Sequence, residues 1–173
     1  MPDNTLATRL RTWVADLDPA AVPPDAVEAA KLLILDQLGL QLAGATSPAV
    51  QPELRLVTAL GAAPEATVAH SGVRTAASYA AFANATLADS SEFDDVHTLA
   101  GHLGSPVVPT ALAFGEAVRA PGREVLTAVV AGAQVMSLLG ARSIVPMVVR
   151  GRPGSKILGT FGAPARPQRP LDG

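Results

Sequence analysis

The stretch Pro23–Gly44 reads PPDAVEAAKLLILDQLGLQLAG and predicts one long helix. Proline is tolerated in the first turn of a helix, where a backbone N–H would have no partner, so Pro23 and Pro24 mark its start. The helix is expected to run to about Ala43, and Gly44 suits its end. Because its residues are apolar on most sides, we expect this helix to be central in the fold.

One charged residue interrupts the apolar run of this helix, at Asp36 between Leu35 and Leu38. A carboxylate at such a position either has a partner or lies on a polar stripe, here together with Gln37 and Gln41. We interpret Asp36 as a structural residue that anchors a backbone group or an arginine.

The segments on either side of this stretch also predict helices. Asp3 or Asn4 is expected to cap the first helix, and Thr75 is expected to cap a later one that is rich in alanine. Together with short connections, these elements predict an all-α helical bundle. The first expected helix ends at about residue 17. Further helices are expected at 23–43, 47–60, 75–88, 105–120 and 123–142, with one short extended piece at 67–69.

The composition limits the classes of protein to which the chain can belong. Apolar residues make up 49% of the 173 residues and aromatic residues only 3%, which excludes disorder and predicts a core of Leu, Val, Ile and Ala. The absence of cysteine excludes disulfides and thiolate metal sites and is consistent with a cytoplasmic location. No targeting segment is expected at the N-terminus.

Two segments raise the question of a membrane or a nucleic acid as partner. Val125–Ala141 has no charged residue, but 17 residues lie at the lower limit of a membrane span, so a buried core helix is expected instead. Basic residues prevail from Arg142 onward, yet no aromatic or helical pattern arranges them as a binding face. We therefore predict neither a membrane nor a nucleic-acid partner.

The C-terminal part changes character after Pro146. Ile157–Gly162 looks like the beginning of an apolar helix that does not develop, and 164–173 is predicted to be a disordered tail.

The segment with the most chemistry is Ser90–His97, which reads SSEFDDVH and is followed by His102. Histidine titrates near neutral pH, and a nearby carboxylate can orient its ring, so such a group can remove a proton beside a carboxylate or protonate a leaving hydroxyl. The segment is predicted to be a loop between two helices of small residues, where it would line a pocket at the end of the bundle. The candidate catalytic residues are Glu92, Asp94, Asp95, His97 and His102.

Other interpretations of this segment are open. Acidic residues between two helices are often only solvated caps. Asp94, His97 and His102 are also plausible metal ligands, but no histidine pair at i, i+4 supports a metal site, and we predict none. His70 stands alone and is interpreted as an ordinary surface or core histidine.

Five segments, in order, resemble the MmgE/PrpD family. The loop segment and the helix before it are similar to the family's N-G-T-x-A-H followed by D-F-D-D-T-H, and the residues from His102 are similar to its H-P-S-x-x-V-x-P. The others are similar to A-K-x-x-L-L-D-x-L-G, G-R-E-x-L-x-A-x-V-x-G and L-G-T-F-G-A. The matching residues are Lys31–Gly39, Asn84–Ala88 with Glu92–His97, His102–Pro109, Gly122–Gly132 and Leu158–Ala163.

The resemblance implies a cofactor-free and metal-free lyase or isomerase. Members have a large helical domain and a smaller lid domain, usually form homodimers, and act on small polycarboxylates by dehydration, decarboxylation or epimerisation. For this chain the resemblance implies an incomplete MmgE/PrpD-like helical domain at 1–163, the tail at 164–173, and no lid domain. A small polycarboxylate and a second copy of the chain are the expected partners.

This sequence departs from the family pattern at several positions. Glu92 replaces an aspartate, Val96 replaces a threonine, and the run 151–155 lacks a second active-site histidine. The family's later catalytic lysine is expected beyond the end of this chain. We therefore expect the lyase or isomerase activity to be impaired. The alternative is a non-catalytic helical oligomerisation module or a pseudoenzyme remnant.

Overall fold

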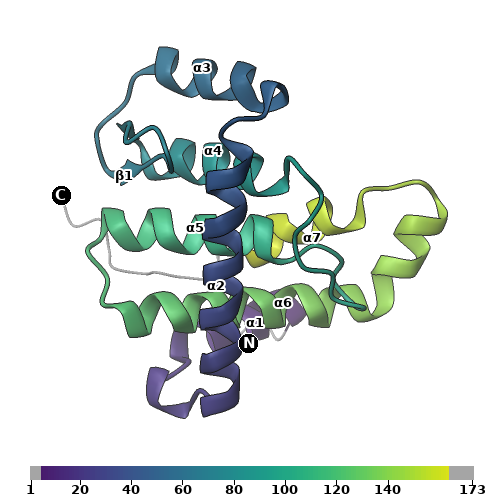
Figure 1. The fold of residues 1–173 in the computed structure, drawn as a ribbon. Coiled ribbons are helices and arrows are strands. Elements are labelled where there is room, and N and C mark those ends of the chain that lie inside the picture. Colours follow the sequence, from purple (N-terminus) through teal and green to yellow (C-terminus); the bar gives the residue numbers. More distant parts are fainter. Residues whose placement is uncertain (1–4, 164–173) are drawn as a thin grey trace.

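The computed structural model describes residues 5–163 of the chain. In that range it is built from seven α-helices and one small antiparallel sheet, which confirms the predicted all-α class (Figure 1). The predicted tail at 164–173 lies outside the described residues. The elements are α1 (Leu6–Asp16), α2 (Pro24–Gly44), α3 (Gln51–Leu60), β1 (Ala66–Thr67), β2 (Arg74–Thr75), α4 (Ala77–Asp89), α5 (Gly104–Ala117), α6 (Gly122–Val149) and α7 (Gly154–Gly162), with 3₁₀ turns at Pro19–Ala21 and Pro48–Val50.

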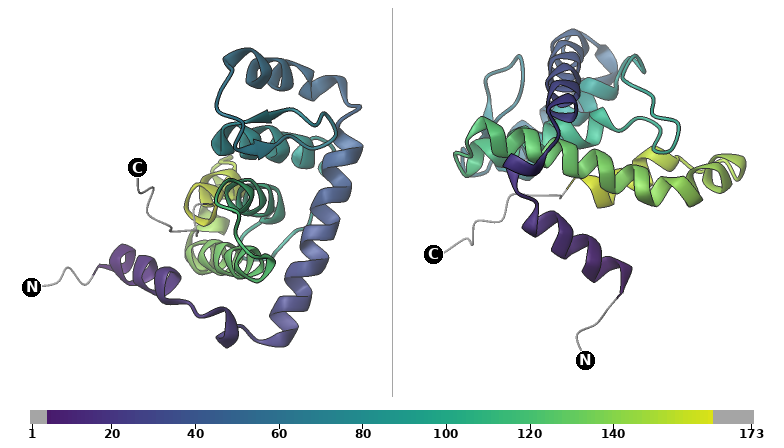
Figure 2. Two further views of the ribbon diagram at one scale, coloured as in Figure 1. Left: turned by 90° about the vertical axis from the view of Figure 1, so that its left-hand side faces the viewer. Right: turned by 90° about the horizontal axis from the view of Figure 1, so that it is seen from below.

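The helices α4, α5 and α6 lie side by side, and α2 packs crosswise over all three (Figures 1 and 2). The right-hand view in Figure 2 looks nearly along α2, which lies on one side of the layer, while α1 extends away on the opposite side. The helix α7 turns back against α6 and α5. The prediction that α2 is central therefore holds for its contacts, but one of its faces is open.

The fully buried positions of α2 are small or polar, whereas Leu33 and Ile34 are only partly buried against the core. Gln37 and Gln41 are 0% and 1% exposed, whereas Leu32 and Leu35 are both 68% exposed. The alternative that Asp36 shares a polar stripe with Gln37 and Gln41 is not seen, because both glutamines are buried and Asp36 is exposed. At this crossing a Cβ on Gly44 would lie 2.6 Å from a serine hydroxyl oxygen that follows α4, so bulky side chains are excluded from it. An apolar composition predicted burial of the helix, but it did not predict which side is buried.

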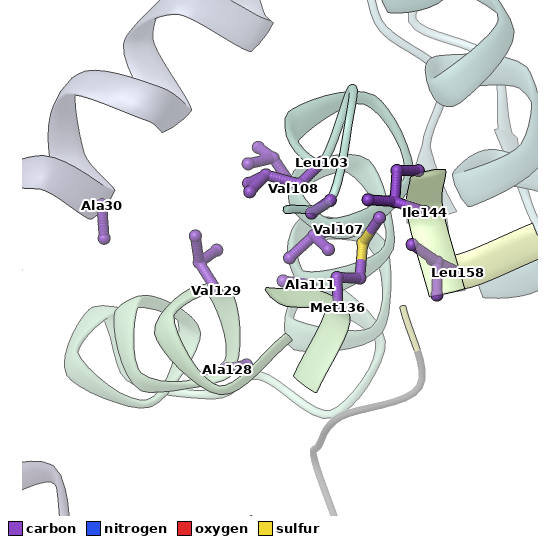
Figure 3. Close-up of a cluster of buried hydrophobic side chains, with 11 residues drawn as sticks. Ala30, Leu103, Val107, Val108, Ala111, Ala128, Val129, Met136, Ile144 and Leu158 are labelled. Carbon is purple, nitrogen blue, oxygen red and sulfur yellow. The ribbon is translucent and has the colours of Figure 1, made fainter. Parts of the chain in front are cut away.

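The interior consists of two apolar clusters. One lies between α5, α6 and α7, where Met136, Val107, Ile144 and Leu158 converge (Figure 3). The other joins α3 and α4 to the small sheet and is made largely of alanine and valine. Small side chains allow helix backbones to approach closely, and a Cβ on Gly132 of α6 would lie 2.8 Å from a carbonyl oxygen of α7. Because these contacts use small residues, the core contains few of the chain's leucines.

Asn84, which belongs to one of the family-like segments, stabilises the sheet. It is 5% exposed, its Oδ1 accepts a hydrogen bond from the Ala69 N–H at 2.8 Å, and its Nδ2 donates one to the Thr67 carbonyl at 3.0 Å. The Asn84 side chain is therefore the hydrogen-bond partner of two backbone groups, as the backbone of a third strand would be. This role is structural and lies away from the loop after α4.

Two helix caps differ from the predicted ones. The α1 cap is Thr5, whose hydroxyl accepts from the Thr8 N–H at 3.2 Å, and Asp3 and Asn4 lie outside the described residues. Thr75 does not cap α4; it lies in β2. The first N–H of α4 donates instead to the Glu65 carboxylate at 3.0 Å. The cap of α4 thus comes from a distant segment, which a local pattern does not reveal.

The C-terminal helices are longer than predicted. The helix α6 continues through Pro146 to Val149, and α7 is a nine-residue helix where only an abortive one was expected. Leu158 is 2% exposed because it packs against α6. By length and composition, α6 is the one helix of residues 5–163 that is apolar enough to cross a membrane, a property that core helices of soluble proteins share.

Candidate functional site

The loop 90–103 joins α4 to α5 and is held against α6 and α7 at two glycine positions. The Leu99 carbonyl rests on Gly140 of α6, where a Cβ would lie 2.8 Å from the carbonyl carbon. Gly101 of the loop faces Ser155 of α7, where a Cβ would lie 3.0 Å from the Ser155 Cβ. The loop is therefore seated on the bundle by close backbone contacts.

Asp94 and His102 form a pair within this loop. The Asp94 carboxylate is fully buried, and its Oδ1 lies 3.0 Å from Nδ1 of His102, whose side chain is 27% exposed. Among the described residues, the other oxygen of Asp94 has no hydrogen-bond partner. Because Nδ1 faces the carboxylate, Nε2 is the ring nitrogen that is left for a substrate.

Asp95 is half-buried beside this pair. Its Oδ1 accepts a hydrogen bond from the Gly104 N–H at 2.9 Å, at the first residue of α5, and it also lies 3.5 Å from Nε2 of Gln37. Burial raises the pKa of Asp95, and the nearby Asp94 and Asp36 carboxylates add to the rise against the opposing hydrogen bond from Gly104. Asp95 therefore holds a proton more readily than an ordinary aspartate.

Glu92 and His97 are placed differently from the other three candidates. Both side chains are exposed, and Glu92 has a left-handed backbone with φ of +53°. His97 is occupied by its own loop: its Nδ1 accepts from the Leu99 N–H at 3.2 Å, and its backbone pairs with Gly101. The structure thus brings together Asp94, Asp95 and His102, and leaves Glu92 and His97 on the outside of the loop.

Sequence analysis missed a second polar group next to this loop. Asp89 at the end of α4 accepts from the buried Ser105 hydroxyl at 3.3 Å and forms an ion pair with Lys156 of α7. It also missed Gln37, which approaches from α2. Lys156 directly precedes the segment Ile157–Gly162, which was expected to begin a helix that does not develop, and Gln37 was considered only as a member of a polar stripe with Asp36. For Gln37, the only sequence signal was a glutamine within an otherwise apolar helix.

The residues weighed as metal ligands are not brought to one point. Asp94 and His102 pair with each other, while His97 is exposed. Within residues 5–163, no group of three or more His, Cys, Asp or Glu side chains is arranged to hold a metal ion. The geometry instead provides a histidine that is oriented by a buried carboxylate, with Asp95, whose pKa is raised by burial, nearby.

Asp36 has a different partner from the predicted backbone group or arginine. It is exposed, and its Oδ2 accepts from Nε2 of Gln37 at 3.2 Å.

Comparison with known proteins gives one finding about the chain as a whole. The family model described as the MmgE/PrpD N-terminal domain matches residues 8–166. A search of curated proteins finds no match.

Proposed function

The chain belongs to the MmgE/PrpD family, and on this premise we propose that its loop carries general acid/base chemistry on a small polycarboxylate. The observation that carries the proposal is the 3.0 Å contact between the buried Asp94 carboxylate and Nδ1 of His102. This pair belongs to the two segments in which the sequence resembles the family's acidic loop and the histidine that follows it.

The proposed chemistry divides the two proton transfers between two residues. His102, oriented through Nδ1 by Asp94, accepts at Nε2 the proton of a carbon beside a substrate carboxylate. Asp95, whose pKa is raised by burial, donates its proton to the departing hydroxyl, so that water and an unsaturated acid are formed. Epimerisation would begin with the same proton abstraction and end with return of a proton to the other face of the carbon, whereas decarboxylation would release CO2 and require delivery of a proton to the carbon that loses it. Glu92 and His97 stay predictions as catalytic residues, and the proposed steps give neither of them a proton transfer.

The charges around the loop limit how well these residues alone can bind such a substrate. The Asp94 and Asp36 carboxylates act on Asp95, and Lys156 is already paired with Asp89. A polycarboxylate is repelled by these acids unless further cations face it. We therefore expect low turnover from this chain by itself.

The experiment compares His102→Asn with His70→Asn. His70 is an exposed histidine in a turn with φ of +66°, a conformation that asparagine tolerates, so it is a matched control. Citrate-like acids are supplied, and the absorbance of the unsaturated product is followed. Loss of one positioned acid or base typically reduces the rate by about a hundredfold to ten-thousandfold. Any turnover should disappear in His102→Asn and persist in His70→Asn.

A binding measurement covers the case of turnover too slow to detect. The ring resonances of His102 should shift when the polycarboxylate is titrated into the unmodified chain, and those of His70 should not. Turnover that survives His102→Asn would refute the proposed role. Absence of both turnover and a His102 shift at millimolar acid would also refute it.

A second function is favoured by a different observation, the open face of α2. Leu32, Leu35 and Leu42 are between 57% and 68% exposed, and a Cβ added to Gly39 between them would meet no atom within 4 Å. Together with Gly39, these leucines follow one another at intervals of three, four and three residues, as in the seam of a coiled coil.

The proposed occupant of this face is a second copy of the chain. Lys31 and Asp36 flank the seam on opposite sides, at positions whose opposite charges meet across a parallel helix pair. Sedimentation velocity should therefore show a dimer that Leu35→Lys converts to a monomer. Leu56→Lys, at a leucine of α3 that is 52% exposed, should leave the dimer intact. A monomer at high micromolar concentration would contradict this function.

A further inference from the structure

The helix α2 presents a fully buried primary amide to the candidate site. Gln37 is 0% exposed although it lies in a helix whose leucines face outward. Burying an amide is unfavourable unless its N–H groups find acceptors, so the side chains that face it matter. Its Nε2 lies 3.2 Å from Oδ2 of Asp36 and 3.5 Å from Oδ1 of Asp95.

These contacts fit the donor nitrogen of the amide, whereas its Oε1 has no hydrogen-bond partner among the described residues. A glutamine amide carries two N–H donors on one nitrogen, and here each has a carboxylate oxygen as acceptor. Asp36 belongs to the same helix, whereas Asp95 is 58 residues away in the chain. The amide therefore links the surface of α2 to the loop that carries the candidate site.

We propose that Gln37 is a positioning residue that bridges Asp36 and Asp95 and fixes the Asp95 carboxylate against the N-terminus of α5. The proton-transfer role of Asp95 rests on the proposed function, but the bridge itself does not.

The surroundings of Asp95 explain why a neutral donor is needed there. Asp36 and Asp94 both repel its charge, and burial opposes ionisation as well. A lysine in place of Gln37 would strongly favour the ionised carboxyl, and a leucine would leave its Oδ1 with the Gly104 N–H alone. An amide holds the carboxyl in place while leaving it able to carry a proton.

Gly104 supports the same arrangement through its missing side chain. A Cβ at this position would lie 2.6 Å from Nε2 and 2.8 Å from Cδ of Gln37, and it would also overlap Oδ1 of Asp95. Glycine at the start of α5 therefore allows the Gln37 amide, the Asp95 carboxylate and a helix N–H to meet. Because Gln37 and Gly104 are both buried, bulk water does not compete freely for these bonds.

The test is an NMR titration of the full chain that follows the aspartate carboxyl carbons and the glutamine side-chain amides. In the unmodified protein, the Gln37 side-chain amide should shift with the same midpoint as the Asp95 carboxyl, and the exposed Gln134 amide should not. In Gln37→Met, which removes the donors but keeps the length of the side chain, the Asp95 midpoint should move upward. Gln134→Met is the matched control and should leave it unchanged.

The outcomes separate this inference from the proposed function. An Asp95 midpoint that does not move in Gln37→Met, or a Gln37 amide that does not follow Asp95, would overturn the bridge whatever the activity. If Gln37→Met does not fold, the amide titration of the unmodified protein decides alone. If the bridge is observed but the chain neither turns over nor binds a polycarboxylate at His102, the positioning role stands and the proposed function fails.

Discussion

Gly140→Ala should loosen the loop that carries Asp94, Asp95 and His102. Gly140 lies in α6, and the Leu99 carbonyl of the loop rests on its Cα. An alanine Cβ would lie 2.8 Å from the carbonyl carbon of Leu99 and closer still to its oxygen, and real Cβ atoms essentially never approach within 3.0 Å of another heavy atom. The obstacle is backbone, so the loop must move by roughly 1 Å or more to make room.

The expected magnitude follows from two opposing effects. Alanine is favoured over glycine in a helix interior by about 1 kcal/mol. Overpacking a well-packed contact costs about 1–3 kcal/mol. Gly140→Ala should therefore be neutral to less stable by about 2 kcal/mol. Gly39→Ala, in an α2 position with nothing within 4 Å of the new Cβ, should be more stable by about 0.5–1 kcal/mol because only the first effect acts.

The assay is urea unfolding of the two variants beside the unmodified chain, with the His102 ring resonances as a local probe. The loop turn is held together by the bonds between His97 and Gly101, so a displaced Leu99 should carry His102 with it. Gly140→Ala should change the His102 resonances, and Gly39→Ala should not. Equal stabilisation by both alanines, with unchanged His102 signals, would refute the seating of the loop on α6.

Three further predictions concern ionisable and buried polar groups. Because burial raises the pKa of Asp95 in the folded chain, the stability contributed by its protonated form is fully present below the unfolded pKa and is lost as the pH rises through the folded pKa. Asp95→Asn should therefore have a larger free energy of unfolding than the unmodified chain at pH 7. Urea unfolding near pH 3 should show that this difference vanishes. Burial raises the pKa of Glu116, but hydrogen bonds from Thr67 and Arg74 outweigh this effect and lower the pKa overall. Glu116→Gln should therefore lower the free energy of unfolding by about 0.5–1 kcal/mol at neutral pH and leave it unchanged below the folded pKa. Unfolding of the variant and the unmodified chain across a pH series measures this difference. Asn84→Ala leaves two backbone groups near β1 without partners and should lower the free energy of unfolding by about 2–4 kcal/mol, and a loss under about 0.5 kcal/mol would contradict its role in the sheet.

The all-α class could be predicted from the sequence because it depends on local properties. Runs of good helix formers bounded by proline and glycine located every α-helix before α7 to within a few residues at its start. The C-terminal part of α6 was underestimated because proline usually ends a helix, yet Pro146 lies inside it. The helix α7 was underestimated because nine residues give a weak pattern, and its stability comes from packing on α6 instead.

The side of a helix that is buried could not be predicted in the same way. In α2, hydrophobicity favoured burial of Leu32 and Leu35, whereas the fold buries Gln37 and Gln41. The reason is tertiary: the surface that α2 crosses contains carbonyls and a loop carboxylate, and these require small or hydrogen-bonding side chains. The exposed leucines of α2 therefore do not contribute to the core of the described chain.

The loop illustrates the same limit and shows which sequence features locate a site. Five titratable residues within 11 positions all looked alike as candidates, but only Asp94, Asp95 and His102 come together. What separates them is the seating of the loop, which depends on Gly104 and Gly140, residues with no side chain to suggest a function. A glycine inside a helix destabilises it by about 1 kcal/mol relative to alanine, and at Gly132 and Gly140 a close backbone contact accompanies this loss, whereas an added Cβ on Gly39 would meet no atom within 4 Å. The acids and histidines of the loop are therefore brought together by contacts at Gly104 and Gly140, which the sequence alone does not distinguish from the open position of Gly39.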